Sequence, residues 1–254
     1  NKGEETDWST WSPEMSEYCE QDVRVTVRLY DKLLALNINP SAVELEHQVA
    51  TIVKRQVDYG FWFNRRLGEE LYVTLIERRE ELRRELVEAF GTWYEPKGKP
   101  TNPKRNNKNR GIVANCPYQN IELVEFNPNS RVHIYKRLMK KYDWKPTQFT
   151  AGGQPQVNEE ILSSLPYPEA QLMSEYLMVQ KRISQLAEGD SAWLKMVNSR
   201  TGRIHGQVTT NGAVTGRMTH NRPNIAQVPA VHVPYGKECR RLFGVPNDKV
   251  LVGC

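Results

Sequence analysis

The sequence predicts a mainly α-helical protein with a small β part, an α+β fold. Two stretches carry the helical prediction, because apolar residues recur every three or four positions through residues 65–90 and again through residues 169–186. This spacing places the apolar side chains on one face of a helix. Residues 204–208 and 213–214 are expected to form short strands, and the apolar residues Val250, Leu251 and Val252 predict a strand over 248–254. With 254 residues, 39% of them hydrophobic, the chain can form a core.

Composition and charge narrow the class of protein. No run approaches the roughly 18 apolar residues of a membrane span, and the charged first residues do not form a signal peptide, so we expect a soluble, cytoplasmic protein. Four cysteines without a C-x-x-C spacing indicate ordinary thiols in a reducing cytosol. The formal net charge of +5 favours an anionic partner.

The first helix is expected to start at Pro13, because Ser12 suits the N-cap position and proline suits the first helical position. Tyr18 and Asp22 are four residues apart and therefore share one face of this helix. Taken alone, the pair is a weak motif that often occurs by chance, and a packed tyrosine beside a solvated aspartate would explain it.

Two more helices follow the break at 37–40. Ser41 is expected to cap the first of them, with Glu44 three residues later, and this helix runs from Ala42 to about Val57. The second is expected over residues 65–90 and ends at Gly91. Its charged residues predict a solvated face, and its apolar stripe comprises Leu67, Leu71, Leu75, Leu82, Leu86 and Phe90.

The segment 97–111 has six basic residues and no acidic one. Two interpretations are open. A flexible basic loop would bind DNA phosphates without reading sequence, and a disordered linker rich in proline and asparagine would have no ligand. In the first interpretation the DNA-binding side chains are those of Lys104, Arg105, Lys108 and Arg110.

A further helix is expected after residue 130, capped by Asn127 or Ser130, with Ile134, Leu138 and Val132 packed inward. His133 is expected on its surface. Residues 144–157 predict a loop or a short hairpin, because this stretch contains a glycine pair and two prolines.

The stretch 211–229 is polar and rich in hydrogen-bond donors. Gly212 and Gly216 permit positive φ and close backbone approach, and Arg217 presents a rigid fork of donors suited to phosphates or base edges. Asn224 and Gln227 carry paired donor and acceptor groups. From chemistry alone, a polyanion-binding turn and an ordinary surface loop are equally supported.

The string Thr215-Gly-Arg-Met-Thr-His-Asn-Arg-Pro-Asn-Ile-Ala-Gln-Val-Pro229 resembles the signature that opens the palm of family A DNA polymerases, most similarly those of the T7-like phage type. The segment 234–244 is similar to the linker that leads to the first catalytic carboxylate. The resemblance implies a remnant of a 3'-5' exonuclease domain at 1–36, a helical thumb at 37–186 and the start of the palm at 187–254.

By this resemblance, Asp22 corresponds to an exonuclease metal ligand and Tyr18 to the residue that positions the attacking water. Lys181 corresponds to a residue that touches the duplex backbone, and Arg217 to one that contacts the minor groove at the primer end. Asn224 and Gln227 belong to the same surface or brace the loop. The cofactor implied for the complete enzyme is Mg²⁺, bound by carboxylates that this chain lacks.

The implied function is part of a DNA-directed DNA polymerase that holds primer-template DNA in phage replication. We expect an incomplete chain, inactive alone, with a C-terminal polymerase fragment as partner across a split-gene or intein junction at Cys254. The short insertion after Gly91 argues against a thioredoxin partner. The alternatives are a non-catalytic DNA-binding subunit of a split polymerase and a structural piece that folds only with the rest of the palm.

Overall fold

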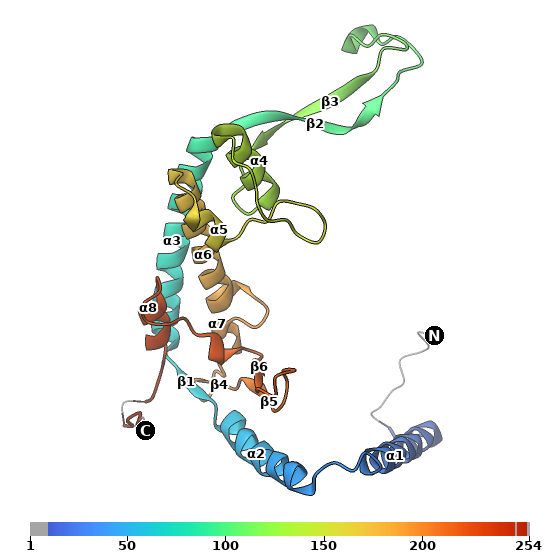
Figure 1. Cartoon of the computed structure of the whole chain (residues 1–254), viewed down its shortest axis with the longest axis vertical. Helices are drawn as coiled ribbons and strands as arrows, with labels where there is room; N and C mark the ends of the chain where they lie inside the picture. Colours follow the sequence, from blue (N-terminus) through green and yellow to red (C-terminus); the bar gives the residue numbers. More distant parts are fainter. Residues whose placement is uncertain (1–9, 247, 253–254) are drawn as a thin grey trace. The chain divides into compact units, whose positions relative to one another are not determined.

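The computed structural model describes residues 10–246 and 248–252 (Figure 1). The chain divides into two compact units. One is formed by Asn1–Tyr59 with Val208–Thr219, and the other by Gly60–Gln207 with His220–Cys254. The three-domain division expected from the sequence, with boundaries after residues 36 and 186, stays a prediction.

The first unit begins with α1 (Pro13–Leu34). The N-cap prediction is confirmed, because the hydroxyl of Ser12 accepts a hydrogen bond from the amide of Met15 at 3.3 Å. Proline lacks a backbone N–H, but an N–H at the first helical position would have no intrahelical acceptor, so proline costs no hydrogen bond there. No residue of α1 is buried.

The second helix, α2 (Pro40–Tyr59), starts earlier than predicted. Ser41 is not its cap. The side chain of Asn39 accepts from the amide of Ser41 at 2.9 Å, and its backbone carbonyl accepts from the amides of Ala42 and Val43. Asparagine caps a helix as well as serine does, so the helix begins directly after it.

Helix α3 (Arg65–Phe90) is the longest element of the second unit, and its bounds are those predicted. Asn64 caps it by accepting from the amide of Leu67 at 3.1 Å, and Gly91 ends it with a φ of 61°. The predicted apolar stripe is confirmed. Its members Leu71, Leu75, Leu82 and Leu86 are buried, and Leu67 and Phe90 pack against them half-buried.

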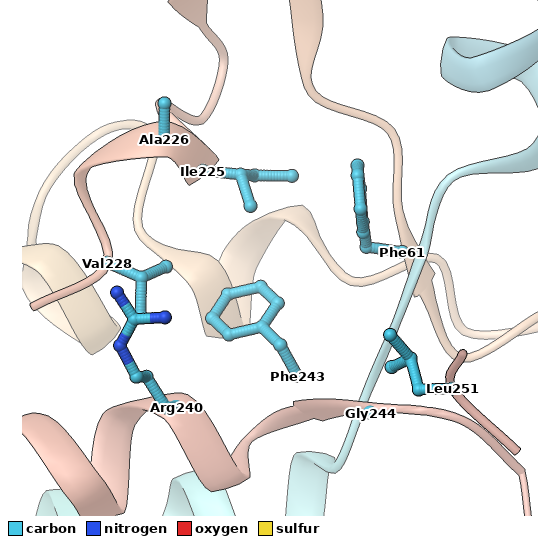
Figure 2. A pocket seen from close by; sticks show the side chains of 8 residues that line it. All are labelled: Phe61, Ile225, Ala226, Val228, Arg240, Phe243, Gly244 and Leu251. Atoms are coloured by element: carbon cyan, nitrogen blue, oxygen red, sulfur yellow. The ribbon is translucent and has the colours of Figure 1, made fainter. Parts of the chain in front are cut away.

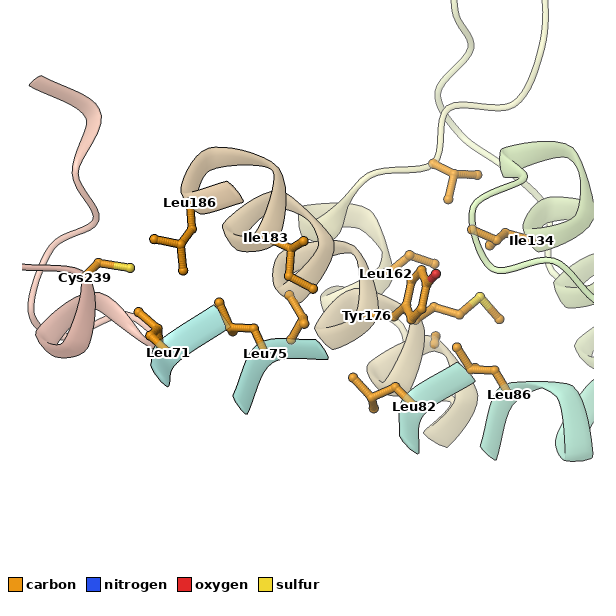
Figure 3. Packing of buried hydrophobic residues seen from close by; sticks show 14 of the residues in the cluster. Leu71, Leu75, Leu82, Leu86, Ile134, Leu162, Tyr176, Ile183, Leu186 and Cys239 are labelled. Carbon is orange, nitrogen blue, oxygen red and sulfur yellow. The ribbon is translucent and has the colours of Figure 1, made fainter. Parts of the chain in front are cut away.

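The core of the second unit lies between α3 and α6 (Pro168–Ile183). Tyr176 and Ile183 of α6 are buried against the leucines of α3 (Figure 3). Removing such side chains from water contributes about 1.5–3 kcal/mol each. The helix predicted over 169–186 changes geometry at its end, because Ser184–Glu188 form a π-helical turn.

A small sheet with strand order β4-β1-β7 joins distant parts of the second unit. Its strands are β1 (Phe61–Phe63), β4 (Arg203–Ile204) and β7 (Phe243–Gly244), and β1 is antiparallel to both neighbours. The rings of Phe63, Phe243 and Trp193 meet edge to face, with centroids 5.1–6.5 Å apart. Trp193 belongs to α7 (Trp193–Met196).

Two of the strand predictions need correction. Residues 213–214 lie in a turn between β5 (Gln207–Thr209) and β6 (Thr219–Asn221), which pair with each other. The side chain of Val214 is fully exposed there, so its apolar character does not indicate a strand. Residues 248–252 form no strand, because no neighbouring strand pairs with them within the described part of the chain; Cys254 lies outside that part.

The basic segment is not the structureless loop or linker that we expected. Its first residues, 97–101, belong to β2 (Thr92–Thr101), which forms an antiparallel ribbon with β3 (Tyr118–Glu125); residues 102–111 lie in the connection between these strands, which includes the 3-10 turn Lys108–Arg110. The register of the ribbon runs from Thr92 opposite Glu125 to Lys97 opposite Asn120. Sequence reasoning missed the ribbon because its prolines, lysines and asparagines lack the alternation of polar and apolar residues that marks a half-buried strand.

Helix α4 (Arg131–Tyr142) is capped by Ser130, whose hydroxyl accepts from the amide of His133 at 3.3 Å. Ile134 and Leu138 are buried as predicted, but Val132 points outward and is 41% exposed. The expected loop or hairpin at 144–157 is a loop with a single bridge between Phe149 and Pro155. The short helices α5 (Glu159–Ser164) and α8 (Gly236–Arg241) complete the second unit.

Among the described residues, every helix is too short or too polar to cross a membrane.

Candidate nucleic-acid interface

Arg217 lies in the tight turn between β5 and β6, and its side chain is exposed. The turn is closed by the amide of Ala213, which donates to the carbonyl of Arg217 at 3.1 Å, and by the amide of Gly216, which donates to the carbonyl of Ala213 at 2.9 Å. The guanidinium Nε donates to the hydroxyl of Thr215 at 3.2 Å. A guanidinium has five N–H donors, so the fork retains donors for an external acceptor.

Both glycines of the turn are required by its geometry. Gly216 has a φ of 76°, a backbone conformation that residues other than glycine rarely adopt. A Cβ on Gly212 would lie 2.0 Å from the hydroxyl oxygen of Thr219. The sequence prediction of special backbone conformations is therefore confirmed, as positive φ at Gly216 and as close approach at Gly212.

Asn224 and Gln227 belong to the second unit, at the start and end of a short 3-10 turn. The backbone of this turn is held from the π-helical segment, because Gln185 Nε2 donates to the carbonyl of Gln227 at 3.1 Å. From α8, Arg240 Nε donates to the carbonyl of Pro229 at 2.8 Å. The loop thus has a braced backbone.

The two predicted side chains of this loop differ in environment. Gln227 is exposed, and its side chain faces solvent. Asn224 is half-buried, and its Oδ1 is buried without a hydrogen-bond partner among the described residues. A buried acceptor without a donor destabilises the folded state. Asn224 therefore does not brace the loop through that oxygen, whereas Gln227 takes part in bracing through its backbone.

A pocket of about 320 Å³ lies beside the 3-10 turn (Figure 2). Ile225, Ala226 and Val228 line it from the turn, and Phe61 and Phe243 from the small sheet. Arg240 is the charged residue of the lining, and it already donates to Pro229. The mainly apolar lining does not suit a phosphate ligand, so the polar atoms of the loop are its more suitable contacts for nucleic acid.

Lys181 is exposed on α6, and its Nζ lies 3.8 Å from a carboxylate oxygen of Glu159. An exposed pair at this distance is worth at most about 1 kcal/mol. Lys181 can therefore leave Glu159 and bind a phosphate with little loss of free energy.

Lys104, Arg105, Lys108 and Arg110 lie at the end of the β2–β3 ribbon, and all four are exposed. The last two belong to a single 3-10 turn, Lys108–Arg110, which Asn107 caps by accepting from the amide of Arg110. The structure thus gathers these basic residues on one element of the second unit.

Tyr18 and Asp22 lie one helical turn apart on α1, and both side chains are exposed. A site for two metal ions needs several oxygen ligands. Within residues 10–246 and 248–252, no group of three or more histidine, cysteine, aspartate or glutamate side chains is placed to hold a metal ion. The described residues therefore offer no complete site of this kind, and the role of Asp22 as a metal ligand stays a prediction.

Gln185 and Arg240 hold the backbone of the loop that contains Asn224 and Gln227, and the sequence analysis did not predict either contact. Each bonds to a backbone carbonyl, 42 residues away for Gln185 and 11 residues away for Arg240. A bond to a backbone carbonyl requires no particular side chain at the partner position, so the sequence carries no signal for either contact.

The chain belongs to DNA polymerase family A, whose sequence model matches residues 105–254. It is 40% identical to the DNA-directed DNA polymerase of Enterobacteria phage T3 and 39% identical to that of Escherichia phage T7.

Each phage match covers 95% of this chain and 43% of the relative, so the chain spans less than half the length of these polymerases. The matched region of 303 residues is longer than this chain of 254, so each relative has residues there that this chain lacks. A DNA polymerase I of Pseudomonas aeruginosa is 30% identical over 50% of the chain and 14% of that protein.

Proposed function

We propose that this chain is the part of a phage DNA-directed DNA polymerase that holds the primer-template duplex during template-directed nucleotidyl transfer. The similarity to two phage polymerases along 95% of the chain carries the proposal. The relatives come from phages, so the expected location is the cytoplasm of an infected bacterium.

In this proposal Arg217 donates to acceptors in the minor groove at the primer end. Purine N3 and pyrimidine O2 acceptors occur there at every base pair, so the contact is independent of sequence. The exposed fork on a closed turn supports this role. Asn224 and Gln227 present amide groups toward the same kind of acceptor, and Lys181 donates to a phosphate.

Metal chemistry is proposed for the complete enzyme alone. Family A DNA polymerases generally depend on metal ions, and Mg²⁺ is the ion that we propose there. The proposal assigns Mg²⁺ to none of the described residues, because they offer no suitable cluster. For Tyr18 and Asp22 the proposed exonuclease roles require further carboxylates, from the complete enzyme, that bind the metal ions together with Asp22.

Substitution of Arg217 tests the proposal in the polymerase that contains this chain. Arg217→Ala removes one localised groove contact among many phosphate contacts. Primer extension from the bound state should fall by about 5- to 150-fold, since one good groove contact is worth about 1–3 kcal/mol. Affinity for the duplex, measured by fluorescence anisotropy, should fall less.

The control is Arg200→Ala, which removes an exposed arginine for which no side-chain bond or ion pair occurs among the described residues. It should leave both extension and affinity unchanged. Reduced affinity with unchanged extension in Arg217→Ala would contradict the primer-end role. A wild-type protein that neither binds duplex nor extends a primer would overturn the proposed function itself.

A further inference from the structure

Three side chains meet at the π-helical turn that ends α6. Nη1 of Arg79, on α3, donates to Oε1 of Glu188 at 3.0 Å and to Oε1 of Gln180 at 3.3 Å. Nε2 of Gln180 donates in turn to Oε2 of Glu188 at 3.4 Å. Each of the three side chains therefore bonds to the other two. The cluster joins α3 to the last residue of the turn, which lies 109 positions further along the chain.

The guanidinium of Arg79 is largely shielded from solvent. Its side chain is 19% exposed, against 37% for that of Glu188. Burial by itself lowers the pKa of Arg79, but the hydrogen bond to Glu188 and the nearby carboxylates outweigh it, so the pKa lies above its ordinary value. Arg79 therefore carries its charge at every pH at which a polymerase is assayed, and the bond to Glu188 does not depend on its titration.

A second residue of the same turn holds the polar loop, residues 224–229. Nε2 of Gln185 donates to the carbonyl of Gln227 at 3.1 Å. The turn is closed by the amide of Gly189, which donates to the carbonyl of Ser184 at 2.9 Å. A Cβ on Gly189 would lie 2.7 Å from that carbonyl oxygen, so a side chain there would force the turn open. Within its five residues, the turn thus has one bond to α3 and one to the polar loop.

The π-helical geometry is selected by contacts outside the turn. Residues 185–188 are strong α-helix formers, so their own preferences do not select the rarer π form. Leu186 is buried in the core that α3 and α6 share (Figure 3). Two side chains bond to Glu188, because Nζ of Lys195 donates to its carbonyl at 2.9 Å and Arg79 donates to its carboxylate. Lys195 is only seven positions away, so the bond from Arg79 is the one that ties the turn to a distant helix.

Two other charged contacts of this unit join elements without involving a residue of the turn or of the polar loop. Arg78, next to Arg79 on α3, donates through Nε and Nη2 to the two carboxylate oxygens of Glu175 on α6, at 2.8 and 3.0 Å. The guanidinium carbon of Arg137 on α4 lies 3.4 Å from the centre of a Trp93 ring. Arg78 therefore provides a matched comparison for Arg79, since its contact joins the same two helices but ends on a regular α-helical residue.

We infer that Arg79 is a positioning residue for the polar loop. It fixes Glu188, and with it the π-helical turn, in the geometry from which Gln185 reaches the carbonyl of Gln227. The inference rests on the proposed function, in which the polar loop contacts the primer-template duplex. A residue of the long helix α3 thereby sets how well the loop is aligned for the duplex. Its effect passes through two hydrogen bonds and one turn of backbone, not through a contact of its own with DNA.

Hydrogen exchange of the loop amides tests the inference without DNA. In the polymerase that contains this chain, Arg79→Gln removes the charge and the reach to Glu188. A partly exposed ion pair shifts an equilibrium by about 5-fold at most. We therefore expect exchange of the amides at 224–228 to rise by about 2- to 5-fold, and that of the core amides of α6 to change less. Mass spectrometry of the deuterated protein measures both regions.

The matched control is Arg78→Gln, which breaks an ion pair between the same two helices. It should leave exchange of the loop amides at the wild-type rate, although it removes two hydrogen bonds. An unchanged rate in Arg79→Gln would overturn the inference. An equal rise in Arg78→Gln would also overturn it, because the effect would then come from general loosening of the helix pair.

A second measurement asks whether Arg79 acts through Gln185. The KM for primer-template and the kcat are measured in steady-state extension for Arg79→Gln, for Gln185→Ala and for the double variant. Arg79→Gln should raise KM by about 2- to 5-fold with little change in kcat. The double variant should have the KM of Gln185→Ala, because the bond that Arg79 supports is already absent there. Multiplied effects on KM would show that Arg79 acts by another route and would overturn the inference.

The inference and the proposed function can fail separately. If Arg79→Gln leaves the loop amides unchanged while the wild-type polymerase binds and extends a primer-template, the inference fails and the proposed function stands. If Glu188→Ala does not reproduce the effect of Arg79→Gln on the loop amides, the coupling does not pass through Glu188 and the inference fails alone. If the wild-type polymerase binds no duplex, the proposed function fails, and the inference fails with it even where the loop amides respond.

Discussion

Gln185 Nε2 donates a hydrogen bond to the backbone carbonyl of Gln227 at 3.1 Å, which ties the end of the α6 helix to the polar loop. The glutamine lies in the π-helical turn, where the amide of Gly189 donates to the carbonyl of Ser184 at 2.9 Å. A π-helical turn inserts a residue relative to an α-helix and so re-aims the side chains around it. Gln185 is accordingly a positioning residue for the loop.

Gln185→Ala should remove the hydrogen bond that holds the loop in place, without unfolding the protein. A net hydrogen bond is worth about 0.5–1.5 kcal/mol, so we expect the KM for primer-template to rise by roughly 2- to 12-fold with little change in kcat. Steady-state extension by the polymerase that contains this chain measures both values. Gln56→Ala is the matched control, because Gln56 is exposed on α2 and no side-chain bond of it occurs in the described structure. Equal KM values for the two variants would contradict the positioning role.

Glu169 links α6 to α4 and should make stability depend on pH in acid. Its carboxylate accepts from Lys141 Nζ at 2.5 Å and from the hydroxyl of Tyr142. Burial by itself raises the pKa of Glu169, but these hydrogen bonds outweigh it and hold the pKa below the ordinary 4.5. The ionised form is therefore favoured by folding, and its contribution is present above pH 4.5 and lost as the pH falls through the lowered pKa.

Glu169→Gln tests this dependence. At neutral pH we expect the free energy of unfolding to fall by about 1–3 kcal/mol, because the substitution weakens bonds to a nearly buried group. Urea unfolding should show the difference from wild type shrinking below pH 4.5. Glu77→Gln, at an exposed position on α3 with no ion pair among the described residues, should change little at any pH. A constant difference across the pH range would contradict the linkage.

The contact between Trp93 and Arg137 should stabilise the attachment of the ribbon. One guanidinium nitrogen of Arg137, Nη2, is buried without a hydrogen-bond partner among the described residues, and burial lowers the pKa of this arginine. The aromatic ring stands in for the missing acceptor. A double-mutant cycle with Trp93→Leu and Arg137→Met should give a coupling energy of about 0.5–2 kcal/mol in urea unfolding.

The control for this cycle uses the opposite face of the ribbon. Tyr94 follows Trp93 on β2, so its side chain points the other way, and it is 68% exposed. A cycle with Tyr94→Leu and Arg137→Met should give a coupling energy near zero. A coupling as large as that of the tryptophan cycle would show that the measured energy comes from general destabilisation rather than from the stacked pair.

Some features of the candidate site could be predicted from neighbouring residues in the sequence, and others could not. The tight turn at Arg217 was predictable, because Gly212 and Gly216 permit its backbone conformation, whereas the role of Arg217 as a DNA contact stays a prediction. The ribbon that ends near Lys104 and Arg105 was not predictable, because β2 and β3 pair residues that are 17 to 33 positions apart in the chain. Strands at 213–214 and 248–252 were predicted wrongly for the same reason, since an apolar run becomes a strand only where a neighbour pairs with it.

The sequence alone determined the long helices, the core stripe of α3, the tight turn at Gly216 and membership of the polymerase family. These depend on periodicity, caps and local backbone freedom, which act between residues a few positions apart. The tertiary structure decided which side chains brace the polar loop, how Glu169 joins two helices and how the basic residues gather at a ribbon tip. Those contacts link positions that are far apart in the chain, and the energies that select among them come from burial and hydrogen bonding in the folded state.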